Sequence, residues 1–93
     1  MAEPSYAKKK RQELKDHIEN YKREHACVRC GCTDWRVLEF HHKDPSQKKF
    51  SIFFAIHNRY SIPAVDREIL KTEVVCANCH RIIHHEWEEL KKM

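Results

Sequence analysis

The sequence predicts a small α+β domain that is stapled by a bound metal ion and carries a basic helix at its N-terminus. Three observations support this prediction. The chain has 93 residues, and a domain of this length buries so little core that a metal or disulfide staple is expected. Two Cys-x-x-Cys pairs, Cys27/Cys30 and Cys76/Cys79, provide such a staple. Apolar residues recur at helical spacing in some segments and alternate as in strands in others.

Residues 1–26 form the first predicted unit, a basic amphipathic helix over 5–25. Its apolar residues Leu14, Ile18 and Tyr21 share one face at helical spacing. Four basic residues crowd a single turn: Lys8, Lys9, Lys10 and Arg11. Such a run suits a solvated helix face and suits phosphate contact, and the sequence favours neither interpretation.

Residues 27–93 complete the single predicted domain. A tight turn over 27–32 contains the only glycine, and a strand follows in which Trp35 and Val37 alternate with their neighbours before it ends at 41–42. After a Pro-Ser turn, helical turns are predicted over 50–56 and a helix over 61–70, with Pro63 in its first turn. A strand over 73–75 and a helix over 78–91 end the domain, the helix with a core face made of Ile83, Trp87 and Leu90.

Composition narrows the class of protein. Charged residues make up 34% of the chain, and 18 Lys and Arg against 14 acids give a net charge of +4, the sign that a nucleic-acid partner requires. No apolar run approaches the roughly 20 residues of a membrane span, and the N-terminus lacks the apolar stretch of a secretory signal. We therefore expect a cytoplasmic protein without a membrane partner, in which cysteines bind metal more readily than they form disulfides.

The four paired cysteines predict a structural Zn²⁺ site. Each Cys-x-x-Cys knuckle supplies two thiolates, and two knuckles complete a tetrahedral site from Cys27, Cys30, Cys76 and Cys79. Cys76-x-x-Cys79-His80 also has the spacing that attaches a c-type haem, but that interpretation leaves the first pair unexplained. Buried free thiols are the third alternative. Cys32 is left over, either as a free thiol or as a ligand in place of Cys30.

The histidines predict a second metal site. The chain has 8 histidines, and neighbours in a strand point to opposite faces, so His41 and His42 should differ in role. If the cysteine knuckles bring the strand end to the last helix, His41 meets His80 and His84, which lie one helical turn apart. Three imidazoles with an open position are typical of a catalytic metal, and His42 is then available as a base. Alone, a His-x-x-x-His pair is usually an ordinary surface pair.

The segments LEFHHKDP and VVCANCHRIIHH, read with the first Cys-x-x-Cys pair, resemble the HNH endonucleases, a branch of the ββα-metal (His-Me finger) nucleases. The resemblance covers residues 27–85 and implies that fold and a metal-dependent DNA endonuclease. It implies that His42 is the general base, that His41 and His80 bind the catalytic ion, and that His84 is a further ligand. Glu39 matches an acid that supports catalysis in colicin-type relatives, although a strand-edge carboxylate is equally expected there.

One position departs from the HNH pattern. The middle Asn, which normally pins the loop beside the base, is replaced by Lys71, followed by Thr72. Asn58 and Asn78 are the candidate substitutes, and Asn78 better fits the tight turn between the last two cysteines, because Asn tolerates the left-handed conformation.

The resemblance implies hydrolysis of double-stranded DNA by one divalent ion (Mg²⁺, Mn²⁺, Ni²⁺ or Zn²⁺) and His-activated water, leaving a 5′-phosphate and a 3′-hydroxyl. Arg81 and Lys43 are candidate phosphate contacts, as is the basic run at 8–11, together with Lys48 and Lys49. Nothing predicts a base-reading module, so we expect cleavage with little sequence preference or targeting by a partner, such as a phage packaging or targeting protein, in a bacterial or phage-infected cell. A homodimer is also possible, and it would decide whether one or both strands are cut. The main rival is a zinc-stapled DNA-binding or adaptor module without activity.

Overall fold

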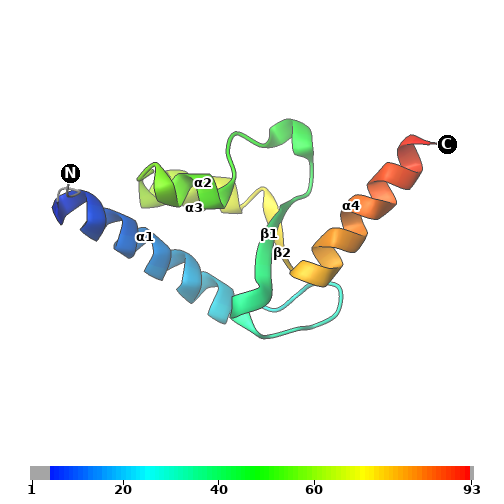
Figure 1. The fold of residues 1–93 in the computed structure, drawn as a ribbon, viewed down its shortest axis with the longest axis horizontal. Coiled ribbons are helices and arrows are strands. Elements are labelled where there is room, and N and C mark those ends of the chain that lie inside the picture. Colours follow the sequence, from blue (N-terminus) through cyan, green and yellow to red (C-terminus); the bar gives the residue numbers. More distant parts are fainter. Residues whose placement is uncertain (1–4, 93) are drawn as a thin grey trace.

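A two-stranded antiparallel sheet stands between a group of three helices and a fourth helix that extends away from it (Figure 1). This computed structural model describes residues 5–92. The predicted first unit, residues 1–26, thus begins with four residues outside the described part of the chain. Over 5–92 the architecture is small α+β, as the sequence predicts, with two strands and four α-helices.

The sheet joins segments that are far apart in the sequence. Strand β1 (Leu38–His42) pairs with β2 (Thr72–Cys76), so that Leu38 lies opposite Cys76 and His42 opposite Thr72. The predicted strand start at 35 is wrong, because Trp35–Val37 form a 3-10 turn. The Asp34 side chain caps this turn by accepting a hydrogen bond from the Arg36 amide at 3.1 Å, and this local bond outweighs the alternating pattern.

The three-helix group holds one core. Helix α1 (Ser5–Arg23) packs against α2 (Ile52–His57) and α3 (Ile62–Ile69), close to the predicted bounds of all three. The side chains of Ser51 and Ser61 cap α2 and α3, which satisfies amide groups that a helix start leaves open. The buried residues of this core come from each helix: Leu14, Ile18, Ile52, Ala55, Val65 and Ile69.

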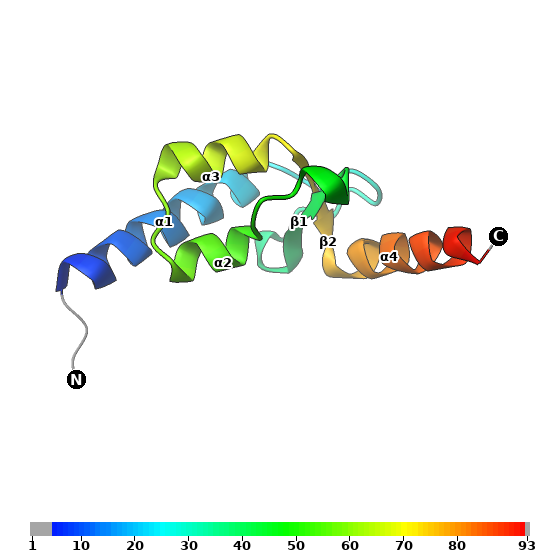
Figure 2. The same cartoon turned by 90° about the horizontal axis from the view of Figure 1, so that it is seen from above.

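A second core lies between the sheet and helix α4 (Ala77–Lys91). It contains Leu38, Val74, Val75 and Ile83 together with buried cysteines. The prediction that Leu90 belongs to the core is wrong, since 65% of it is exposed. Figure 2 shows the reason: the C-terminal half of α4 extends beyond the sheet and has no element beside it. No helix within residues 5–92 has the length and apolarity to cross a membrane.

Candidate metal and active site

The four paired cysteines converge on one point, as their spacing predicts. One knuckle comes from the turn before β1 and the other from the junction of β2 with α4, and the four sulfurs lie within 4.8 Å of one another. The Sγ atoms of Cys30 and Cys76 are 3.7 Å apart. Tetrahedral zinc with Zn–S bonds near 2.3 Å requires sulfurs about 3.8 Å apart, so the cluster fits Zn²⁺.

Backbone amides prepare this cluster for thiolates. The amides of Cys30 and Cys79 point at the sulfurs of Cys27 and Cys76, at 3.5 and 3.4 Å. Burial alone raises the pKa of Cys27, but amides of Cys30, Cys76 and Arg29 lower that pKa to about 6. The hydrogen bond to Cys76, and then burial, raise the pKa of Cys79 to about 12. Four thiolate charges at this spacing repel one another, and a divalent cation would compensate them.

Cys32 is not part of this cluster. It is half-buried against the second core, and its carbonyl accepts a hydrogen bond from the Cys27 amide at 2.9 Å. Its contribution is therefore the backbone turn of the first knuckle. The grouping uses all four paired thiols together, which a haem attached at Cys76 and Cys79 does not explain.

Three histidines form a second cluster on the other side of the same helix start. The ring nitrogens of His41, His80 and His84 lie within 4.8 Å of one another. The Nε2 atoms of His80 and His84 are 3.0 Å apart, which is the spacing of two neighbouring ligands about 2.1 Å from an ion at right angles. The cluster passes from buried His41 to exposed His84, so one side of it opens to solvent.

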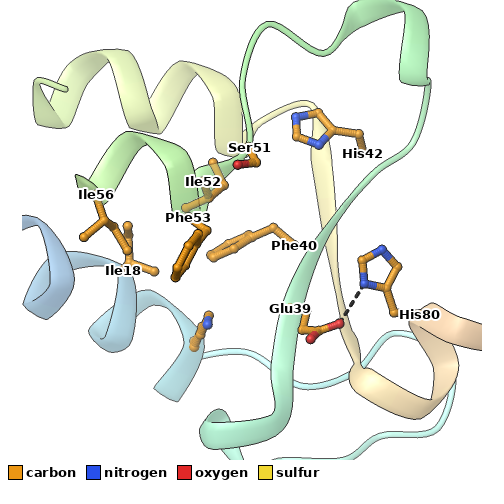
Figure 3. A pocket seen from close by; sticks show the side chains of 10 residues that line it. Ile18, Glu39, Phe40, His42, Ser51, Ile52, Phe53, Ile56 and His80 are labelled. Atoms are coloured by element: carbon orange, nitrogen blue, oxygen red, sulfur yellow. Dashed lines mark hydrogen bonds and ion pairs between the residues drawn. The ribbon is translucent and has the colours of Figure 1, made fainter. Parts of the chain in front are cut away.

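Glu39 supports this cluster from the strand. Its Oε1 lies 2.7 Å from His80 Nδ1 (Figure 3). A carboxylate oxygen can only accept, so Nδ1 donates and His80 Nε2 keeps its lone pair toward the other two histidines. Metal-binding histidines are commonly oriented in this way by a carboxylate. Glu39, the candidate for supporting catalysis, thus contacts the predicted ligand His80 rather than the predicted base His42.

His41 is prepared to bind a cation in its neutral form. Burial, and then the neighbouring His80 and His84, lower the pKa of His41 from its ordinary 6.5. A neutral imidazole is the form that binds metal. The three histidines therefore fit a divalent ion, with His80 and His84 supplying the open side.

His42 is not part of this cluster, and its ring lies apart from that of His80 in Figure 3. Its Nε2 lies 2.8 Å from Glu68 Oε2, so Nε2 donates and the lone pair is on Nδ1. Sequence reasoning missed Glu68 altogether. It is 2% exposed, and no motif marks it, because only the fold brings α3 beside the end of β1.

Two cavities connect the histidines. A cavity of about 170 Å³ is lined by all four: His41, His42, His80 and His84. A larger one, of about 380 Å³, is drawn in Figure 3; it lies between α1, α2 and β1 and is also lined by His42 and His80. Its walls are largely apolar, with Phe40, Phe53 and Ile56 facing it (Figure 3). The candidate base and the candidate ligands thus share one solvent-accessible space.

The predicted phosphate contacts are placed unequally. Arg81 borders the surface beside Glu39, His80 and His84, and Lys48 lines the small cavity. Lys43 is exposed and lies beside His41 on the opposite side. The basic run at 8–11 lies in the first turns of α1, at the far end of a molecule 50 Å long (Figure 1), and does not approach the histidines.

Neither asparagine proposed for the departure in the motif anchors the loop after β1. Asn58 caps α2 by donating to the Phe54 carbonyl at 2.8 Å. Asn78 lies in the first turn of α4, and Arg59 is the one non-glycine residue among 5–92 with a positive φ, so the left-handed conformation expected for Asn78 is wrong. The loop is held instead by Lys71, whose Nζ donates to the Gln47 carbonyl at 3.0 Å.

Comparisons with models of protein families, with curated proteins and with solved structures give no match to this chain. The functional interpretation therefore depends on the residues and their arrangement.

Proposed function

We propose that this protein is a metal-dependent DNA endonuclease of the HNH, ββα-metal kind. The observation that carries the proposal is one small cavity lined by three clustered histidines and by a fourth, His42, that is not part of the cluster. A module that only binds DNA has no use for a potential base beside an open metal position. The order of β1, β2 and α4, stapled by cysteines at the start of α4, agrees with this assignment.

The chain's own residues divide the reaction between them. His41, His80 and His84 would hold the divalent ion, which when bound offsets the negative charge that develops on the phosphate. His42 accepts a proton at Nδ1 from a water molecule in the cavity. That water attacks phosphorus as the bond to the 3′ oxygen breaks. The 3′ oxygen takes up a proton from solvent as it leaves, and His42 passes the proton that it took from the attacking water to solvent, so the products are a 5′-phosphate and a 3′-hydroxyl.

Positive charge near the cavity supports DNA as the substrate. Arg81 stands beside the histidines, where its guanidinium can bind a neighbouring phosphate at two points. Lys48 is a second contact from the loop after β1. Lys8, Lys9 and Lys10 on α1 are more distant candidate contacts, since a molecule 50 Å long can span about one and a half turns of duplex DNA. These contacts carry no base information, and cleavage should show little sequence preference.

Plasmid cleavage tests the proposal. Protein treated with EDTA is checked for retained zinc and fold, then given magnesium, manganese, nickel or zinc with supercoiled plasmid. Wild type should nick or linearise the plasmid, and folded His42→Ala should cut about 10²–10⁴-fold more slowly.

His85→Ala is the matched control, because His85 neighbours His84 but has a side chain that is 74% exposed and lies beside Glu89. It should cut like wild type. Folded, zinc-bound wild type that shifts DNA on a gel but never cuts with any of the metals would overturn the nuclease and favour the inactive adaptor.

A further inference from the structure

The buried carboxylate of Glu68 links the candidate base to the loop that follows it. Its Oε2 accepts hydrogen bonds from His42 Nε2 at 2.8 Å and from the Lys49 amide at 3.0 Å. Its Oε1 accepts from Lys71 Nζ at 2.9 Å. Lys71 donates in turn to the Gln47 carbonyl at 3.0 Å. Both ends of the loop over 43–49 are therefore attached to one pair of charged residues, since the Lys43 amide also donates to the Lys71 carbonyl at 3.1 Å.

We propose that Glu68, held by Lys71, is the positioning residue of His42. It keeps Nε2–H directed at its carboxylate and leaves the Nδ1 lone pair facing the cavity, where water is activated. The same pair anchors the loop and so replaces the asparagine of the HNH motif. This inference rests on the proposed nuclease function and deepens it.

Stability alone does not explain the arrangement. Glu68 is 2% exposed, and taking a carboxylate out of water costs several kcal/mol, so a buried ion pair is often no more stabilising than apolar residues of the same volume. Burial raises the pKa of Glu68, but the Lys49 amide, Lys71 and His42 lower it to about 2. The carboxylate is therefore an acceptor at every working pH, which is the property that holds His42 in one tautomer.

A second histidine–carboxylate pair supplies a matched control. His17 Nε2 lies 2.6 Å from Asp66 Oδ1, with 33% and 52% of the two side chains exposed, and Asp66 lines neither of the cavities beside His42. Asp66→Asn removes the same kind of contact from the same helix without touching the site. Any loss of activity that comes from disturbing α3 should therefore appear in both Glu68→Gln and Asp66→Asn.

The kinetic test compares Glu68→Gln, His42→Ala and the double variant. We expect Glu68→Gln to lower kcat by about 10²-fold, with KM and zinc content unchanged, and Asp66→Asn to cut like wild type. In the His42→Ala background Glu68→Gln should cost nothing further, because Glu68 acts through His42. If the losses in kcat of the two single variants multiply in the double variant, the role of Glu68 is merely structural. If Glu68→Gln does not fold because Lys71 loses its partner, Glu68→Gln/Lys71→Met removes both charges and takes its place in the same comparison.

Nitrogen-15 NMR of the imidazoles gives a readout without DNA. At pH 8 His42, assigned by its absence from the His42→Ala spectrum, should carry its proton on Nε2 in wild type and in Asp66→Asn, and lose this single tautomer in Glu68→Gln. A proton on Nδ1 in wild type overturns the positioning role, as does unchanged kcat in Glu68→Gln. Wild type that never cuts DNA overturns the nuclease instead, whatever tautomer His42 shows.

Discussion

The cysteine cluster and the histidine cluster are built on the same helix start, yet they suit opposite tasks. Cys79 and His80 are consecutive residues of α4, and they turn to different sides of it. Four sulfurs occupy all the coordination positions of a tetrahedral ion, so the cysteine cluster leaves no position for substrate. Three imidazoles leave positions open, and their outer member, His84, is exposed. A residue of the closed cysteine cluster, which would fix the backbone, thus directly precedes a residue of the open histidine cluster, whose geometry needs a fixed backbone.

Under the proposed function, the comparison indicates how so small a chain would hold its reactive groups in place. Zinc binding would tie the turn before β1 to the first turn of α4, and that turn carries His80. The Arg29–Glu86 ion pair, at 2.8 Å, adds a second link between the first knuckle and α4, further along the helix. We therefore expect the geometry of the histidine cluster to depend on the cysteine cluster, and the cysteine cluster to be independent of the histidines. Variants of the two clusters should differ accordingly.

The largest expected effect is loss of the fold on breaking the cysteine cluster. Structural zinc sites in small peptides contribute about 10–16 kcal/mol, which matches or exceeds the roughly 5–15 kcal/mol that stabilises a whole domain. Cys76→Ser should therefore release zinc and abolish the cooperative thermal transition, measured by zinc content and circular dichroism.

His84→Ala is the matched change in the other cluster. Because His84 is exposed on a helix, its loss should alter the free energy of unfolding by less than about 1 kcal/mol, while metal-dependent cleavage falls at least tenfold. Equal loss of stability in the two variants would contradict the division between a closed and an open site.

The sequence predicts the two clusters well and their supports poorly. Cys-x-x-Cys spacing and the four-residue step in α4 are local rules, and the structure brings their residues together, while of the neighbours His41 and His42 only His41 joins the cluster. Glu68 lies 26 residues from His42 and reads as an ordinary helical residue, so only the packing of α3 against the strand end reveals it. The 3-10 turn before β1 escaped prediction because the Asp34 cap competes with a pattern that also fits a strand.

A smaller effect is expected from Glu39→Gln, which tests how much the carboxylate supports metal binding by the open histidine cluster. The amide keeps the shape of the side chain, but its hydrogen bond to His80 Nδ1 is weaker than that of the carboxylate at 2.7 Å. Supports of this kind typically change metal affinity by about 10–100-fold. Titration of the zinc-loaded protein with nickel or manganese should therefore show weaker binding, and excess metal should restore cleavage.

If excess metal does not restore cleavage by Glu39→Gln, Glu39 acts on the reaction itself rather than through His80. Glu73→Gln is a suitable control, because Glu73 is a half-buried carboxylate on the partner strand, opposite His41 in the sheet register. It should bind nickel with an affinity close to that of wild type.

The smallest expected effect is the change in stability with pH that comes from protonation of His41. Burial is the main cause that lowers the pKa of His41 below 6.5, and the charges of His80 and His84 come second. As pH falls, the unfolded chain therefore takes up a proton on His41 at a higher pH than the folded protein does. With no ion at the histidines, the free energy of unfolding should decrease as pH falls below 6.5, until the pH has passed the lowered pKa of His41 in the folded protein. In an NMR titration of zinc-bound protein, His41 should titrate below 6.5. His84→Ala should raise that midpoint but leave it under 6.5, since burial remains. A midpoint at or above 6.5 in wild type would show that water reaches His41 and that the solvent-exposed side of the histidine cluster includes the strand residue as well.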